Sequence, residues 1–378
     1  MPYPDSKRVV LGMSGGVDSS VAAKLLKQQG YEVIGVTLKV WEEEDESSAT
    51  KRWQERGCCK VGMARHVAEL LGISHHVIDT RERFQKGVID DFIGGYIQGT
   101  TPNPCVRCNE RVKFGGLFQV ADDLGADYIA TGHYANIGHD EGGTSFLVRG
   151  QDSKKDQSYF LYRIPPSWLS KMMFPLGEME KPAVWKEAES MGLPVDELKE
   201  SQEICFVTQG DYRQFLKQQA PQSSSPGMFV DGKGNELGRH QGVAFYTPGQ
   251  RKGLGIAGGS RLYVQRVLPE KNMVVLGPAE DLDSTECLVS DLNIFSPEAL
   301  RNSPRIDVKF RYSTPPVRGT HQWSGSTSMT IRFDAPVRAL SPGQSAVFYL
   351  GDRVLGGGII QVPTPMKSIQ KREKSILS

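Results

Sequence analysis

The sequence has almost no net charge and contains no long apolar run. Its 378 residues carry 45 Lys and Arg against 44 Asp and Glu, a net charge of +1. This balance excludes the overall positive field of a general nucleic-acid binder, so any contact with RNA must use local basic patches. No apolar run approaches the length of a membrane span, and the N-terminal stretch 1–8 is polar. We therefore expect no membrane segment or signal peptide and a cytoplasmic location.

Cysteine is scarce as well. In a reducing cytoplasm the six cysteines do not form a disulfide framework, so we expect buried, metal-ligating or reactive thiols. They are Cys58, Cys59, Cys105, Cys108, Cys205 and Cys287. No internal repeat is evident, and the length exceeds one ordinary hydrophobic core, which predicts two or three domains.

A small-residue loop, Ser14–Ser20, lies between an apolar run, Val9–Met13, and a helical pattern, Val21–Leu26. Gly15 and Gly16 allow backbone N–H groups to approach an anion, and the helix N-terminus adds partial positive charge. The loop lacks the Gly-Lys-Ser/Thr ending of a Walker loop and the spacing of a dinucleotide fingerprint. It resembles the PP-loop of ATP pyrophosphatases, which bind ATP through its pyrophosphate and adenylate a substrate oxygen.

The first half of the chain alternates strand and helix patterns, which predicts an α/β fold with a doubly wound parallel sheet. Ligands of such sheets bind beyond the carboxyl ends of the strands, where the glycine-serine loop lies. Two polar insertions, Glu42–Arg56 and Gly99–Asn109, are expected to be loops. The predicted strands are Val9–Met13, Val33–Leu38, His76–Ile78 and Tyr128–Thr131; the predicted helices are Ser19–Gln29, Met63–Leu71, Arg81–Ile97 and Lys113–Leu124.

After about Gln209 short β-branched and aromatic runs alternate with turn residues, which predicts two small β-rich modules, the last a β-barrel. We therefore expect a PP-loop domain (adenine nucleotide alpha hydrolase-like) at 1–208, a central β-rich domain at 209–280, a C-terminal barrel at 281–363 and a disordered basic tail at 364–378. The predicted strands are Met228–Val230, Val243–Tyr246, Leu262–Val267, Met273–Leu276, Asp307–Tyr312, Ser328–Phe333, Ser345–Leu350 and Arg353–Ile360.

The second chemical motif is the stretch Thr101–Asn109, in which two prolines precede Cys105-Val106-Arg107-Cys108. A Cys-x-x-Cys pair alone fits a redox dithiol, half a zinc site or a nucleophile. A zinc site needs a second pair, and Cys58-Cys59 has the wrong spacing, so no metal site is expected. Cys205, taken alone, is typical of a buried core residue.

Taken together, these motifs resemble the tRNA-specific 2-thiouridylase family. The resemblance covers most of the chain, and beyond the PP-loop its ordered set of motifs is specific to that family. The motifs that carry it are Gly12–Ser20, Thr101–Asn109, Thr131–Tyr134, Lys155–Tyr159, Ile204–Phe206, Tyr246–Gly255 and Arg311-Tyr312.

The resemblance implies an ATP- and Mg²⁺-dependent enzyme that replaces the 2-oxygen of the wobble uridine in the tRNA anticodon stem-loop by sulfur. It implies Cys108 as the nucleophile and Cys205 as the persulfide carrier, loaded by a donor such as a cysteine desulfurase or sulfur-relay protein. The implied ATP-binding residues are Gly12, Met13, Ser14, Gly15, Gly16, Val17, Asp18, Ser19, Leu38 and Gly132. The implied tRNA contacts are Asn103, Pro104, Cys105, His133, Lys155, Asp156, Gln157, Arg311, Tyr312 and Gln344.

Cys105 departs from the family, much of which has an aspartate there. A thiol does not replace a carboxylate at the same pKa. Cys105 is then a substituted acid/base group, a resolving thiol for Cys108, or an iron–sulfur ligand together with Cys108 and Cys205. We favour the persulfide route, because cluster ligation cannot be derived from spacing. One alternative function is a PP-loop ligase that acts on a small metabolite, but it would leave these thiols unused. Another is an RNA-binding or sulfur-carrier protein with a degenerate loop, which would leave the ATP loop unused.

Several residues keep two interpretations. His133 either contacts RNA or caps the end of its own loop. Gln250–Gly253 is either a solvated turn or a phosphate contact. Arg311-Tyr312, expected on a strand, offers RNA a cation and a stacking ring, or forms a cross-strand packing pair. Cys287 and the Cys58-Cys59 pair are expected to pack in the protein interior.

Overall fold

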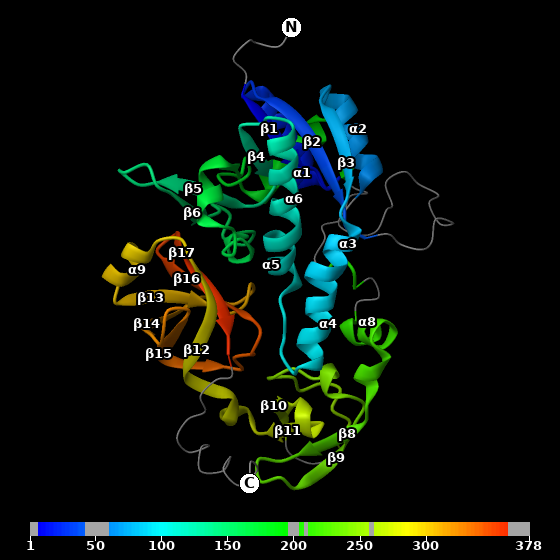
Figure 1. Cartoon of the computed structure of the whole chain (residues 1–378), viewed down its shortest axis with the longest axis vertical. Coiled ribbons are helices and arrows are strands. Elements are labelled where there is room, and N and C mark those ends of the chain that lie inside the picture. Colours follow the sequence, from blue (N-terminus) through cyan, green and yellow to red (C-terminus); the bar gives the residue numbers. More distant parts are fainter. Residues whose placement is uncertain (1–6, 42–59, 196–203, 208–210, 257–260, 362–378) are drawn as a thin grey trace. The chain divides into compact units, whose positions relative to one another are not determined.

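The computed structural model describes residues 7–41, 60–195, 204–207, 211–256 and 261–361. The chain divides into two compact units, 1–89 with 104–210 and 352–354, and 90–103 with 211–351 and 355–378 (Figure 1). The insertion 42–56, the pair Cys58-Cys59 and the tail 364–378 lie outside the described residues. No helix in the described ranges is long and apolar enough to cross a membrane.

A parallel sheet forms the centre of the first unit, in the order β3-β2-β1-β4-β7. The order reverses beside β1, so its carboxyl end is the switch point at which ligands of open α/β sheets bind. Gly12 at that end pairs with Val36 on one side and Thr131 on the other. The predicted doubly wound sheet is confirmed. Its strands are β1 (Arg8–Gly12), β2 (Glu32–Lys39), β3 (Ser74–Asp79), β4 (Tyr128–Thr131) and β7 (Met172–Met173).

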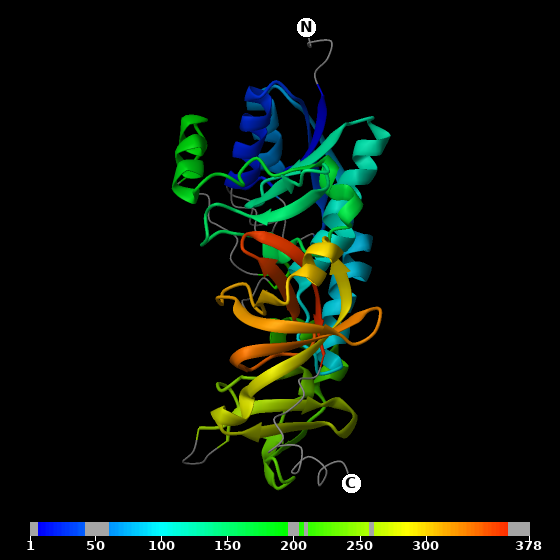
Figure 2. The same cartoon turned by 90° about the vertical axis from the view of Figure 1, so that its left-hand side faces the viewer.

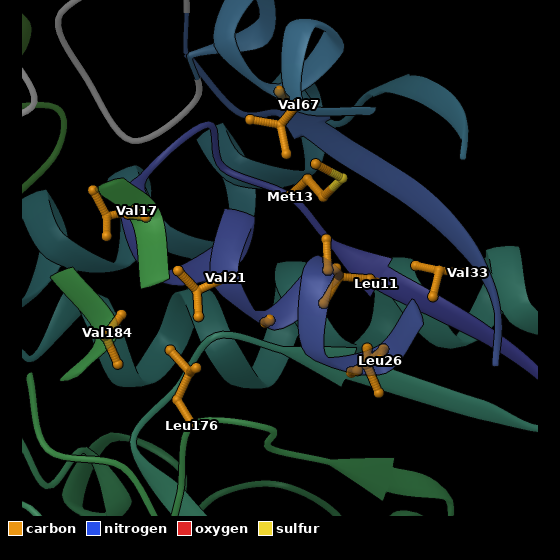
Figure 3. Close-up of a cluster of buried hydrophobic side chains, with 14 of the residues drawn as sticks. Leu11, Met13, Val17, Val21, Leu26, Val33, Val67, Leu176 and Val184 are labelled. Carbon is orange, nitrogen blue, oxygen red and sulfur yellow. The ribbon is translucent and has the colours of Figure 1, made fainter. Parts of the chain in front are cut away.

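Helices α1 (Val17–Gln28), α2 (Val61–Leu71) and α7 (Lys181–Ser190) contribute to the main core of this unit. Figure 3 shows how side chains from these helices and the sheet meet. Each fully buried aliphatic side chain stabilises the fold by about 1.5–3 kcal/mol. This packing fixes α1, and with it the loop that precedes α1. The labelled core residues are Leu11, Met13, Val17, Val21, Leu26, Val33, Val67, Leu176 and Val184.

The predicted loop over Gly99–Asn109 is wrong in its second half. Residues from Pro104 onward form α5 (Pro104–Cys108), a π-helical turn (Asn109–Lys113) and α6 (Phe114–Asp123) in succession. Proline suits the first helical position, because its φ is preset and the missing N–H has no intrahelical partner there. Both cysteines of the motif therefore lie on a helix.

The predicted helix Arg81–Ile97 exists with one irregularity. It consists of α3 (Arg81–Phe84), a π-helical turn (Gln85–Ile89) and α4 (Asp90–Ile97), and the division between the two units falls before α4. The remaining regular elements of the first unit are the hairpin of β5 (Ala135–His139) and β6 (Ser145–Arg149), and the 3₁₀ turns Ser158–Phe160 and Pro166–Lys171.

The second unit contains a four-stranded sheet in the order β10-β11-β8-β9. The run Val243–Tyr246, predicted as a strand, is instead a 3₁₀ turn at Val243–Phe245 with Ala244 and Phe245 buried. A short apolar run cannot be assigned to strand or buried helical turn by periodicity alone. The other elements are α8 (Tyr212–Gln219), β8 (Gly227–Val230), β9 (Glu236–His240), β10 (Tyr263–Leu268), β11 (Met273–Gly277) and the 3₁₀ turns Pro221–Ser224, Pro269–Lys271 and Ala279–Leu282.

The same unit contains a six-stranded antiparallel β-barrel, drawn yellow to red in Figure 2. It is closed by pairing of β12 with β17, which confirms the predicted barrel. Cys287 is fully buried in its core, and burial, helped by the charge of Glu286, raises its thiol pKa to about 12. Cys287 is thus a packing residue, as expected. The elements are β12 (Asp283–Ile294), α9 (Pro297–Asn302), β13 (Arg305–Lys309), β14 (Val317–Trp323), β15 (Ser328–Arg338), β16 (Ser345–Leu350) and β17 (Arg353–Ile360).

Candidate functional site

The loop between β1 and α1 requires glycine at Gly15. Its φ is +73°, and a Cβ there would lie 2.2 Å from the carbonyl oxygen of Lys60. Both the left-handed backbone and the close approach exclude a side chain. Gly16, the N-cap of α1, brings no capping side chain, and its carbonyl accepts from the hydroxyls of Ser19 (3.0 Å) and Ser20 (2.9 Å).

Further hydrogen bonds set the shape of this loop. The Ser14 N–H donates to Ser19 Oγ (3.2 Å), and the Lys60 N–H donates to the Ser14 carbonyl (2.8 Å). The loop lies at a helix N-terminus, where partial positive charge favours an anion. A preformed turn of this kind binds phosphate without first paying the entropy of ordering itself.

Gly132 follows β4 at the switch point and packs directly against the start of α1. A Cβ at this position would lie 2.8 Å from the Asp18 carbonyl carbon and 2.9 Å from the Ser19 nitrogen. The structure therefore brings Gly132 next to the glycine-serine loop Ser14–Ser20, called the phosphate loop below, although more than a hundred residues separate them in the sequence. Leu38, near the carboxyl end of β2, is buried and faces Gly116 of α6.

Lys181 is a residue of this site that the sequence did not reveal. Its Nζ donates to Asp18 Oδ1 (2.7 Å), and the Tyr134 hydroxyl donates to the same oxygen (2.8 Å). The Lys181 side chain is 8% exposed, and its Nζ lies 5.1 Å from the ring centre of Trp185. A buried cation next to the phosphate loop is suited to stabilising negative charge there. No motif signals it, because its partner is 163 residues away.

The two cysteines of the Cys-x-x-Cys motif differ in exposure. On α5, Cys105 is exposed and Cys108 is buried. Glu110, just past α5, pairs with Arg107 (2.9 Å) and Arg163 (2.8 Å), and these partly buried ion pairs fix the helix. A π-helical turn follows Cys108 directly, and such irregularities occur frequently at functional sites.

Cys205 is half-buried in a short turn. The Val207 N–H donates to the Ile204 carbonyl (2.9 Å), and Phe206 is buried with its ring 5.7 Å from that of Phe84. Within the described ranges, no three His, Cys, Asp or Glu side chains gather as a metal site.

Asp156 and Gln157, two of the three consecutive residues expected to contact tRNA, accept hydrogen bonds from the backbone. Asp156 is 3% exposed, and its Oδ1 accepts from the backbone N–H groups of Gly150 (3.1 Å) and Ser158 (3.0 Å). Gln157 Oε1 accepts from the Tyr134 N–H (3.0 Å). Lys155 is partly exposed. Contact with RNA stays a prediction for all three, but Asp156 and Gln157 also brace the turn that presents Lys155.

Arg311 and Tyr312 lie in a turn after β13, so their predicted placement on a strand is wrong. β13 ends at Lys309, whose Nζ lies 5.3 Å from the Tyr312 ring centre, and the ring is 37% exposed. An exposed ring beside cations is suited to stacking with an unpaired base. Of the other expected tRNA contacts, Gln344 donates its side-chain amide to the backbone carbonyls of residues 101 and 102. Asn103 and Pro104 form the junction into α5.

His133 is neutral in this structure. Burial, with a contribution from the charge of Lys113, lowers its pKa to about 3. Its Nδ1 shares a hydrogen bond with Thr131 Oγ1 (2.8 Å), and its ring lies 5.9 Å from that of Phe114. A neutral imidazole does not offer a positive charge to phosphate, and its bond to Thr131 supports the loop-capping interpretation.

His133 makes folding stability depend on pH. Because its pKa is lower in the folded state than the ordinary value of 6.5, stability is present above pH 6.5 and is lost as the pH falls toward 3. At pH 5.5 one such histidine lowers the free energy of unfolding by at most about 1.4 kcal/mol relative to its value well above pH 6.5. In His133→Asn we expect a smaller loss of unfolding free energy between pH 7.5 and 5.5 than in wild type, measured by urea denaturation. An equal loss in both proteins would show that His133 titrates normally.

A glycine-serine loop at the switch point of a parallel sheet, with a helix starting directly after it, defines a PP-loop nucleotide-binding domain. Family models match three successive regions. Residues 7–209 match the tRNA methyl transferase HUP domain, 213–278 the tRNA methyl transferase PRC-barrel domain and 284–360 the aminomethyltransferase beta-barrel domain.

Curated relatives match the whole of this arrangement. The tRNA-specific 2-thiouridylase MnmA of Clostridium perfringens is 44% identical over 360 residues, covering 94% of this chain and 98% of the relative. The protein of the same name from Clostridioides difficile is 45% identical with the same coverage. That of Moorella thermoacetica is 46% identical, covering 93% of this chain and 99% of the relative. The chain belongs to the tRNA-specific 2-thiouridylase family.

Proposed function

We propose that this protein thiolates the 2-position of the wobble uridine of tRNA in an ATP-dependent reaction. The observation that carries the proposal is that one unit contains both a preformed phosphate loop and the two cysteines, Cys108 and Cys205. The names of the relatives agree with this function. An amide-type oxygen is a poor leaving group, so sulfur can replace it only after activation.

In the first step the 2-oxygen of uridine attacks the α-phosphorus of ATP, and pyrophosphate leaves. The loop Gly12–Ser19 would hold the phosphates, with Leu38 and Gly132 shaping the nucleotide site. The Asp18 carboxylate and neighbouring hydroxyls are the oxygen donors that Mg²⁺ prefers, and the ion would neutralise charge on the departing pyrophosphate. Lys181, held at Asp18, adds a fixed positive charge beside the same phosphates.

In the second step Cys205 carries the terminal sulfur as a persulfide. The Cys108 thiolate attacks the inner sulfur of Cys205, a Cys108–Cys205 disulfide forms, and sulfide is released. Sulfide attacks C2 of the uridine and displaces AMP. An external thiol then reduces the disulfide, and a cysteine desulfurase or sulfur-relay protein reloads Cys205. This route uses only the two thiols and an external donor.

The test is to incubate the protein with tRNA, ATP, Mg²⁺ and a sulfur donor, and to measure 2-thiouridine by mass spectrometry of digested tRNA. AMP and pyrophosphate should each form once per thiolated uridine. AMP release that depends on ammonia and a small metabolite, with no sulfur in tRNA, would indicate an amide-forming PP-loop ligase instead.

Binding of tRNA would use a basic cavity in the second unit. This cavity, of about 440 Å³, is lined by Arg251, Gly253, Leu254, Gly255, Ile256, Arg261 and Leu262. Gly253 and Gly255 have positive φ (76° and 66°), and the Arg213 guanidinium lies beside Gly253. Arginines around such a glycine turn are suited to RNA phosphates, which favours the phosphate-contact interpretation of Gln250–Gly253.

We expect Arg251→Ala and Arg261→Ala each to weaken tRNA binding several-fold and to reduce the slope of log affinity against log salt by about 1, since each removes one phosphate contact. Filter binding at several salt concentrations measures both quantities. The control is Lys233→Ala, an exposed lysine in the turn between β8 and β9. If affinity and slope match wild type in both arginine variants, the cavity does not bind RNA.

A further inference from the structure

The side chain of Gln344 holds the backbone that leads into the Cys-x-x-Cys helix. Its Nε2 donates to the carbonyl of Thr101 (2.8 Å) and, at a longer distance, to that of Pro102 (3.4 Å). All three residues belong to the second unit. The next residues along the chain are Asn103 and Pro104, where α5 begins.

The backbone around Gln344 closes on the same segment. The Thr101 N–H donates to the Pro342 carbonyl (2.7 Å). Gly343 has φ +89°, and a Cβ there would lie 2.9 Å from both Thr100 Cβ and Thr101 N. With the Gln344 amide, the turn 339–344 contacts residues 100–102 through three successive positions. Hydrogen bonds therefore hold residues 100–102 through the Thr101 N–H as donor and through the Thr101 and Pro102 carbonyls as acceptors.

This turn is itself anchored to the barrel. The Gly343 N–H donates to the Ile360 carbonyl (2.9 Å), and the Ile360 N–H donates to the Gln344 carbonyl (2.8 Å). At its other end, Arg311 Nη2 donates to the carbonyl of Ala339 (2.5 Å), a residue with a strained φ of +56°. One turn thus connects Arg311, an expected RNA contact, with the segment that precedes Asn103, another expected tRNA contact.

We propose that Gln344 is a positioning residue for thiolation, which holds Asn103, the residue before the Cys-x-x-Cys helix, in place through the carbonyls of Thr101 and Pro102. This inference rests on the proposed function and assigns Gln344 a role other than binding tRNA. A primary amide fits because one nitrogen carries two N–H donors. Glutamate would place a carboxylate oxygen against carbonyl oxygens and would repel the segment.

The test compares Gln344→Glu and Gln344→Ala with wild type in two assays. At saturating tRNA and ATP, we expect the single-turnover thiolation rate to fall at least tenfold in Gln344→Glu and less in Gln344→Ala. The Kd for tRNA should stay within twofold of wild type. The matched control is Gln361→Ala, because the Gln361 amide donates elsewhere in the barrel, to Ser290 Oγ (2.6 Å), and its loss should leave the rate unchanged.

Hydrogen exchange of the protein without tRNA gives a second readout. The Thr101 amide, bonded to Pro342, should exchange faster in both Gln344 variants and at the wild-type rate in Gln361→Ala. A raised Kd with an unchanged rate at saturation would overturn the proposal and make Gln344 a tRNA contact. Wild-type protein that thiolates no tRNA would contradict the proposed function, whereas wild-type activity with unaffected Gln344 variants would contradict only the positioning role.

Discussion

Cys108→Ser and Cys205→Ser are each expected to lower 2-thiouridine formation at least a thousandfold while leaving ATP-dependent pyrophosphate release measurable. A serine hydroxyl neither ionises near neutral pH nor carries a persulfide, so sulfur transfer stops. In the proposed mechanism adenylation depends on the loop between β1 and α1, which these substitutions do not touch. Serine is close to cysteine in size, so α5 and the Ile204–Val207 turn keep their packing. Single-turnover mass spectrometry and a pyrophosphate assay measure the two half-reactions separately.

The control for this experiment is Cys287→Ala, which removes a thiol that lies in the barrel core with a pKa of about 12. It should thiolate tRNA at nearly the wild-type rate. Full thiolation by either the Cys108 or the Cys205 variant would refute the persulfide mechanism. Cys105→Asp separates the roles of the exposed thiol on α5, because a carboxylate can replace an acid/base group but not a resolving thiol.

The parallel sheet and its phosphate loop could be predicted from sequence because their signals are local. An apolar strand, a glycine turn and a helix follow each other over residues 8–28, and Gly15 at φ +73° is the glycine that the turn requires. The Lys181–Asp18 pair could not be predicted this way, because only the fold brings these residues together. Long-range ion pairs depend on tertiary packing and leave no periodic pattern.

Two other errors have physical causes. Paired prolines around Asn103 indicate a loop, yet the second proline starts a helix, where its fixed φ is favourable. The sequence pattern does not predict β14, because most of Val317–Trp323 is exposed or half-buried and lacks the apolar alternation of a core strand. Its place in the barrel comes from pairing with β13 and β15, for example Gly319 opposite Phe333.

Gly132→Ala is expected to weaken ATP binding more than tenfold. The added methyl group would lie 2.8 Å from the Asp18 carbonyl carbon and 2.9 Å from the Ser19 nitrogen, closer than backbone atoms tolerate. Because the obstructing atoms are backbone, the first turn of α1 must move away from β4, and the amides of the phosphate loop move with it. Overpacking of this kind costs about 1–3 kcal/mol of folding stability. Isothermal titration with a non-hydrolysable ATP analogue measures the affinity, and urea denaturation measures the stability.

The matched control is Gly94→Ala in α4, where an added Cβ meets nothing within 4 Å. Alanine is favoured over glycine in a helix by up to about 1 kcal/mol, so this variant should be as stable as wild type or more stable, with unchanged ATP affinity.

If Gly132→Ala loses stability but binds ATP normally, α1 has moved without disturbing the nucleotide site, and the phosphates do not contact its first turn. If both affinity and stability fall, the loop and Gly132 act together, because the contact that holds α1 in place also sets the distance between the loop and β4.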